Sequence, residues 1–213
     1  MKSRLESHLF WGPHSPLSAL GGAGLIIMAS GRVSFALISG ITLIWVYGLS
    51  ALVYSGSRPI LPVRGRMIVL LFLSTFLCGI FLFLLSLLNP LLVIGMEFFL
   101  LLIPVCCLGS GLFNGTESVY PGELVTRALL EAVVLAVIIL AFALLREPLG
   151  MGTLSLPGGV QGIVELFSPD DDGGFIPVRI LSASAGGLLL LGFGISLFRY
   201  FRERSGGTME ENQ

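Results

Sequence analysis

Residues 144–159 read LLREPLGMGTLSLPGG, and they end a long apolar region of the chain. An adjacent charged pair, Arg146 and Glu147, closes the apolar run, and Pro148 follows at once. Proline has no main-chain N–H and its ring clashes with the preceding helical turn, so Pro148 predicts the end of a helix. The glycines that follow permit main-chain conformations that other residues avoid. We therefore expect the chain to take a tight, sheltered path after this helix.

The composition indicates a membrane protein. Of the 213 residues, 54% are hydrophobic and only 12% are charged, and the formal net charge is −1. A soluble domain contains about 25% charged residues, so a chain with half that share cannot cover a surface that faces water. The near-neutral charge gives no indication of nucleic-acid binding. We predict an all-α integral membrane protein that forms a single membrane domain over residues 1–213.

Five to six transmembrane helices are predicted, since a helix needs about 20 apolar residues to cross a bilayer. The expected spans are 33–54, 67–88, 91–113, 124–145 and 179–198. Residues 11–30 are either a sixth, thinner helix or an interfacial segment. The connection 146–177 is expected to lie at the interface or to re-enter the membrane sheltered by other helices, because unpaired main-chain amides cannot face lipid.

Charges between the spans predict the orientation. The 55–66 loop carries three arginines and no acidic residue, and the tail after residue 198 also begins with arginines. Positive loops stay in the cytoplasm, so both segments, and with them the C-terminus, are predicted to be cytoplasmic. The acidic 146–177 connection is then outside.

Carboxyl groups inside the spans are candidates for ion transport, since ionisable residues within a membrane are usually functional. Glu131 lies on one helical face with Glu123 and Arg127. The three form either a neutralised ladder near the inner interface or, through Glu131, an ion or proton path. Glu97 stands alone in its span and is either a protonated carboxyl bonded to a neighbouring helix or a cation site. Arg146 and Glu147 are either an interfacial ion pair or groups that line a site beneath a re-entrant segment.

The three cysteines, Cys78, Cys106 and Cys107, all lie in apolar runs. Zinc and iron–sulfur sites usually take four protein ligands, which three thiols cannot supply. Cys106 and Cys107 could bind one metal ion only where the helix is broken, and Pro104 allows such a break. From these residues alone, we favour small buried apolar side chains over metal ligands.

Residues 145–154, LREPLGMGTL, resemble the segment that closes the fifth helix in the membrane subunits of the Rnf and sodium-pumping NADH:quinone oxidoreductase complexes (RnfA/RnfE and NqrD/NqrE). That family has an Arg-Glu-x-x-Gly-x-Gly type motif, matched here by Arg146, Glu147, Gly150 and Gly152. Two weaker matches stand in the same order. Tyr47–Leu52 resembles the family's Gly-Leu-Cys-Pro turn, and Leu102–Cys107 resembles its Ile-Pro-Leu run leading to Asn-Cys.

The resemblance implies six helices in two inverted repeats with re-entrant half-helices, in the bacterial cytoplasmic (inner) membrane. It implies a translocase-type oxidoreductase complex rather than an enzyme alone. A paralogous membrane subunit would be the partner, with a [2Fe–2S] cluster shared between the two. Electron transfer across the bilayer would drive the translocation of Na⁺ or H⁺.

The ligand positions depart from the family pattern. Ser50 occupies the expected cysteine position of the first repeat, and Cys107 stands for the ligand of the second, with Cys106 where Asn is expected. Serine is a hard, poor substitute for a thiolate at iron. Three functions therefore remain open: a divergent electron-transport subunit, a cluster-free scaffold or assembly subunit derived from that family, and an unrelated small membrane transporter.

Overall fold

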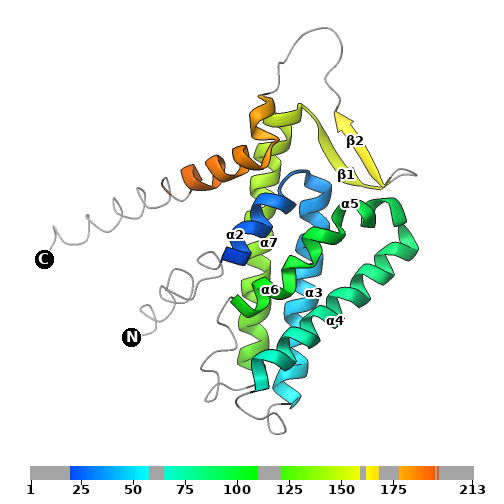
Figure 1. Cartoon of the computed structure of the whole chain (residues 1–213), viewed down its shortest axis with the longest axis vertical. Coiled ribbons are helices and arrows are strands. Elements are labelled where there is room, and N and C mark those ends of the chain that lie inside the picture. The colour runs from blue at the N-terminus through cyan, green and yellow to red at the C-terminus, as the bar shows by residue number, and fades with distance from the viewer. Residues whose placement is uncertain are drawn as a thin grey trace, which may run out of the picture.

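The computed structural model describes residues 20–57, 65–109, 121–158, 162–167, 178–194 and 196. Its helices are α2 (Leu20–Ala29), α3 (Val33–Ser57), α4 (Arg66–Leu88), α5 (Pro90–Leu100), α6 (Leu102–Gly109) and α7 (Pro121–Met151), with strands β1 (Leu154–Pro157) and β2 (Ile163–Phe167) and the 3₁₀ turn η3 (Arg179–Leu181). A further apolar helix, Ser184–Gly194, follows η3 and is orange in Figure 1.

Four helical segments are long and apolar enough to cross a membrane, which confirms the prediction of an all-α membrane protein. They are Val33–Ser57, Arg66–Leu88, Pro90–Leu108 and Gly122–Met151, and each overlaps a predicted span. The other two expected spans are described only in part. Residues 20–29 of the 11–30 segment form α2. In the 179–198 segment, residues 179–183 form η3 and a turn rather than part of a long helix, and residues 184–194 form the last helix; residues 11–19, 195, 197 and 198 lie outside the described residues.

The long helices α3 and α7 form the centre of the bundle and run antiparallel, side by side (Figure 1). Gly40 lies against Ala136, and Gly48 lies against Leu129 at the other end of the contact. A Cβ built on these glycines would come within 3.1 Å and 2.9 Å of the facing side chains. Small residues let two membrane helices approach closely, and close packing holds such helices together. The closely packed α3–α7 pair therefore holds the elements at its ends in fixed positions.

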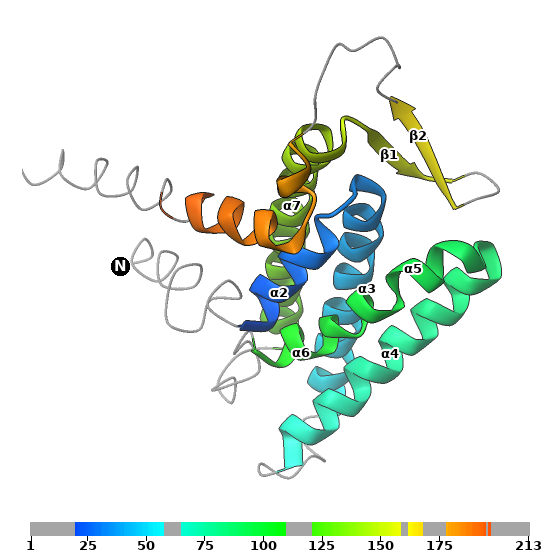
Figure 2. The same ribbon diagram turned by 45° about the horizontal axis from the view of Figure 1, so that its top comes forward.

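Helix α4 lies on the outside of the bundle, as Figure 2 shows. It exposes large apolar side chains along its length, among them Phe72, Phe76 and Phe83. A soluble protein rarely exposes an apolar surface of this extent. This surface is suited to contact with lipid.

The span Pro90–Leu108 is interrupted at Leu101, between α5 and α6. Pro104 lacks the N–H that would bond to the carbonyl of Leu100, four residues earlier. The Cys78 thiol on α4 donates to that carbonyl instead, at 3.2 Å. The break at Leu101 thus precedes Pro104. The helix is not broken at the cysteines, as one metal ion bound to both would require, because Cys106 and Cys107 both lie within α6.

The prediction that Pro148 ends the helix is wrong. Helix α7 continues through Pro148 to Met151, and it ends at Gly152, whose φ of 71° is in the left-handed region. The N–H of Gly152 donates to the carbonyl of Pro148 at 2.9 Å, as in many helix C-caps. The proline removes one hydrogen bond in the last turns, and it leaves the contacts of the two preceding side chains in place.

The 146–177 connection forms an antiparallel hairpin in its described part, with Leu154 opposite Phe167 and Pro157 opposite Ile163. The hairpin lies across the ends of the helices, where α7 finishes (Figures 1 and 2). Ser155 is buried against Ser34 of α3, with their hydroxyl oxygens 3.2 Å apart. The hairpin therefore packs on the start of α3, and residues 159–161 and 168–177 of this connection lie outside the described residues.

Candidate functional site

Arg146 is 3% exposed and directs its guanidinium at main-chain oxygens of two other elements. It donates to the carbonyl of Ile27, at the C-terminal end of α2, and to the Ser30 hydroxyl. It also donates to the carbonyls of Leu181, Ser182 and Ala183 at 2.8–2.9 Å, in the turn between η3 and the last helix. The planar guanidinium has five N–H donors. Arg146 thus joins α7, α2 and the start of the last helix.

Glu147 is 1% exposed and points to the neighbouring helix start. Its Oε2 accepts the main-chain N–H of Val33, the first residue of α3, at 2.6 Å. Its Oε1 accepts the Thr153 hydroxyl at 3.5 Å. The first N–H groups of a helix have no partner within the helix, and the positive end of the helix dipole favours a carboxylate there. Glu147 therefore caps α3.

The two charged residues act at opposite helix ends that are only a short turn apart. Arg146 binds the C-terminal end of α2, where a cation is favoured, and Glu147 binds the N-terminal start of α3, where an anion is favoured. They form no ion pair with each other within the described part of the chain. The expected ion pair between these two residues is therefore absent. Main-chain groups and the hydroxyls of Ser30 and Thr153 supply the partners instead.

Gly150 of the motif and Gly187 of the last helix allow this close packing. A Cβ at Gly150 would lie 2.8 Å from the main-chain nitrogen of Ser182, and one at Gly187 would lie 3.1 Å from the guanidinium of Arg146. The N–H of Val178 also donates to the carbonyl of Leu149 at 2.9 Å. The Arg146–Gly152 motif is therefore the point at which α2, α3, α7 and the last helix are joined.

Glu131 on α7 and Cys107 on α6 are two of the predicted site residues that lie within the membrane-spanning helices. Oε2 of Glu131 is closed off from solvent and has no hydrogen-bond partner among the residues that the structure describes. Cys106 and Cys107 are both buried.

Ser50 lies in the uninterrupted helix α3 and is fully buried. Residues 47–52 form no turn here, unlike the family segment that they resemble. The Ser50 hydroxyl has no hydrogen-bond partner in the described part of the structure. A buried hydroxyl is usually bonded to protein or to water.

Cys106, Cys107 and Ser50, the residues that the resemblance assigns to a shared [2Fe–2S] cluster, are all buried within this chain. Cys106 and Cys107 are also neighbours on an intact helix, so their side chains point in different directions. Within the described ranges, no three His, Cys, Asp or Glu side chains are grouped to hold a metal ion.

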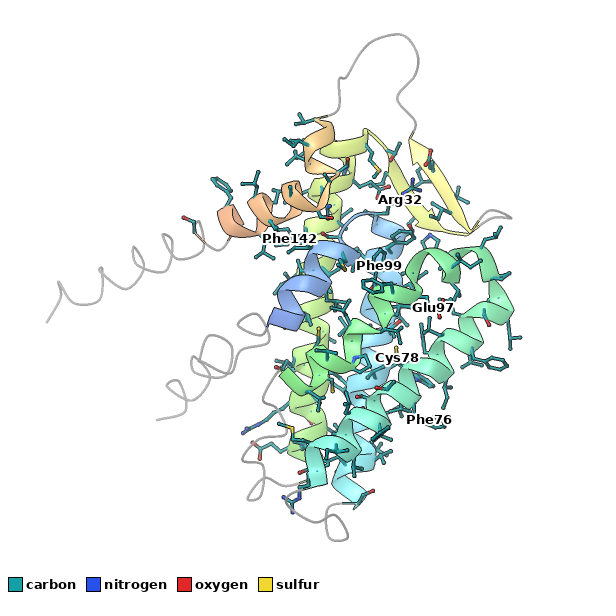
Figure 3. All side chains as sticks on the ribbon, in the orientation of Figure 1. Arg32, Phe76, Cys78, Glu97, Phe99 and Phe142 are labelled. Carbon is teal, nitrogen blue, oxygen red and sulfur yellow. The ribbon has the colours of Figure 1, made fainter. Side chains whose placement is uncertain are left out.

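Glu97 lies on α5, away from the Arg146–Glu147 pair on α7. Its side chain, labelled in Figure 3, is exposed, whereas Met96 and Leu100 on the same helix are buried. Sequence reasoning missed the role of Cys78 as a cap for the Leu100 carbonyl. Pro104, which leaves this carbonyl without a helical donor, was the available signal.

A comparison with protein-family models gives no match, and a search among curated proteins gives no significant match.

Proposed function

We propose that the chain is a membrane subunit of an electron-transport complex of the Rnf and sodium-pumping NADH:quinone oxidoreductase type. The complex couples electron transfer to the translocation of Na⁺ or H⁺. A paralogous membrane subunit and other electron-transport subunits are its partners. The membrane is the bacterial cytoplasmic (inner) membrane, with the C-terminus of the chain in the cytoplasm.

The observation that supports this proposal is the buried Arg146–Glu147 pair. The specific part of the resemblance is the Arg-Glu-Pro-Leu-Gly-Met-Gly segment, and in this fold its residues are not a loose surface loop. Arg146, Glu147 and Gly150 each make or permit a contact between α7 and another element: α2 for Arg146, α3 for Glu147 and the turn before the last helix for Gly150. A motif whose residues are each needed for specific contacts is a better basis for a family resemblance than apolar composition, which all membrane proteins share.

Glu131 is the better placed of the two carboxyl groups expected to carry the coupled cation. Its Oε2 is enclosed within the protein, whereas Glu97 lies on the outside. Ionisable groups on ion paths face a bundle interior or a water-filled cavity. Glu131→Gln should abolish cation-dependent activity and leave expression unchanged. Glu123→Gln, two helical turns away and largely exposed, is the matched control and should keep the activity.

The second candidate is a cluster-free scaffold subunit within the same kind of complex. The specific observation in its favour is the burial of Cys106, Cys107 and Ser50 inside this chain. If the chain carries no metal, its contribution is to hold partner subunits in the membrane and to provide the carboxyl group of Glu131.

The test is to purify the protein gently from its native membrane with its companions, and to measure the visible spectrum, iron and acid-labile sulfide. The proposal predicts companions that carry flavin or iron–sulfur groups. Colour lost in Cys107→Ala and kept in Cys78→Ser would make this chain a cluster-bearing subunit. Colour kept in both variants would support the scaffold. A colourless chain without companions would contradict both and favour an independent transporter.

A further inference from the structure

The exposed side of the α5–α6 span combines apolar side chains with one acidic side chain. We name as the α5–α6 outer face the residues Ile94, Glu97, Phe98, Leu101 and Val105, all of which are exposed. The opposite side of α5 is the buried one. Leu92, Met96 and Leu100 lie in the core there, and Phe99 packs against Phe35 with ring centroids 6.0 Å apart. Glu97 and Phe99 are both labelled in Figure 3.

Lipid is a poor neighbour for this face. Glu97 is eight residues beyond Asn89, at roughly 12 Å along the helix for a rise of 1.5 Å per residue. Long Lys and Arg side chains can extend from such a depth to the interface, but a glutamate is too short. Placing a charged side chain in the middle of a bilayer costs about 3 kcal/mol or more. The ion pairs in the described part of the chain, Arg32–Glu165 and Arg127–Glu123, leave Glu97 without a cation.

We propose that the α5–α6 outer face binds a membrane-spanning helix of a different subunit, and that this helix places a Lys or Arg side chain against Glu97. Charge complementarity selects the partner, because a basic residue at this depth removes the cost of the exposed carboxylate. The apolar residues above and below Glu97 supply the packing surface, as at other interfaces where an apolar core surrounds a few polar contacts.

A second copy of this chain is a poor occupant. A two-fold interface would place the same patch of each copy against the other, and would bring two Glu97 side chains together. The arginines within the described spans are not placed to pair with Glu97 of a second copy. Arg127 pairs with Glu123, Arg146 is buried and binds main-chain carbonyls, and Arg66 lies at the start of α4, at the far end of that helix. The α4 surface, by contrast, exposes apolar residues such as Phe76 and is suited to lipid.

Photo-crosslinking tests the face directly. Phe98 and Phe76 are matched positions, since both are phenylalanines in apolar helices and are 67% and 65% exposed. Each is replaced in turn by benzoylphenylalanine in the full chain, and native membranes are irradiated. From position 98 we expect a crosslink to a membrane-spanning peptide of another subunit that contains Lys or Arg. From position 76 we expect lipid adducts. A position-98 crosslink to this chain itself, to a span without a basic residue, or to lipid alone would overturn the proposal.

The role of the charge is tested with the same crosslink. Glu97→Lys should lower the position-98 yield by about tenfold, the factor that corresponds to a lost interaction of 1.4 kcal/mol. Glu97→Gln keeps the size of the side chain and should give a smaller decrease if the lysine variant does not fold. Changing the identified basic residue of the partner to Glu should restore the yield with Glu97→Lys. An unchanged yield in both Glu97 variants would show that the carboxylate does not select the partner.

Discussion

The carboxylate of Glu147 accepts the main-chain N–H of Val33 at 2.6 Å and so joins the end of α7 to the start of α3, 114 positions apart in sequence. Its neighbour Arg146 binds the end of α2 in the same region. Two adjacent residues of opposite charge therefore serve as separate caps for two different helices. The cost of burying each charge is offset by main-chain partners that would otherwise be unsatisfied.

Removing the carboxylate of Glu147 should destabilise the protein in two steps. Glu147→Gln keeps an oxygen that can accept the Val33 N–H but loses the charge, and should cost about 1 kcal/mol. Glu147→Ala leaves the N–H buried without a partner and should cost about 3 kcal/mol. The free energy of unfolding is measured by titration with SDS in mixed micelles. The control is Glu165→Gln, which removes an exposed ion pair of 3.7 Å and should change stability by less than about 0.5 kcal/mol. Equal effects at both positions would contradict the capping role.

Arg146→Lys should be nearly as harmful as Arg146→Ala, although it keeps the charge. A lysine has three donors on one nitrogen and cannot reach the carbonyls of Ile27 and Leu181–Ala183 together. We expect a loss of about 2–3 kcal/mol. In the same titration, Arg127→Lys is the matched control, since Arg127 makes one largely exposed i,i+4 ion pair and should lose little. A stable Arg146→Lys variant would show that charge alone is needed.

The membrane spans could be predicted because length and apolar composition carry the signal by themselves. The four long spans lie close to their predicted positions. The end of α7 was mispredicted because Pro148 is only a local signal, and the helix is held beyond it by side chains that contact other elements. The hairpin was missed for a related reason: five residues at Ile163–Phe167 are too few to show a strand period.

The burial of Arg146 and Glu147 could not be predicted from sequence. A charged pair at the end of an apolar run is typical of an interface, and most of the groups that bind this pair are main-chain carbonyls and an N–H. Main-chain groups carry no sequence signal, since every residue has them. The motif could be recognised, but its contacts depend on how α2 and the last helix pack against α7. For the same reason, the exposure of Glu97 could not be predicted from the sequence of its span, because it depends on how α5 packs against the other helices.

Gly150→Ala should be strongly destabilising, because the added Cβ would lie 2.8 Å from the Ser182 nitrogen and would push the η3 turn away from α7. We expect a loss of about 2 kcal/mol, the usual cost of overpacking. Gly79→Ala on α4 is the matched control, since a Cβ there meets no atom within 4 Å. Helix propensity alone should make that variant equal to the parent or more stable by up to about 1 kcal/mol. A neutral Gly150→Ala would mean that the turn is not packed against α7 in this way.

The thiol of Cys78 should matter only because of Pro104. Cys78→Ala leaves the buried carbonyl of Leu100 without its donor and should cost about 1 kcal/mol, whereas Cys78→Ser keeps a donor and should cost less. Pro104→Ala supplies a main-chain N–H four residues after Leu100, so the helix itself can then bond this carbonyl. In that background, Cys78→Ala should lose most of its effect, and the double-mutant cycle should give a coupling free energy near the full single-variant cost. Additive effects of the two substitutions would contradict this account, because they would mean that the thiol and the missing N–H do not serve the same carbonyl.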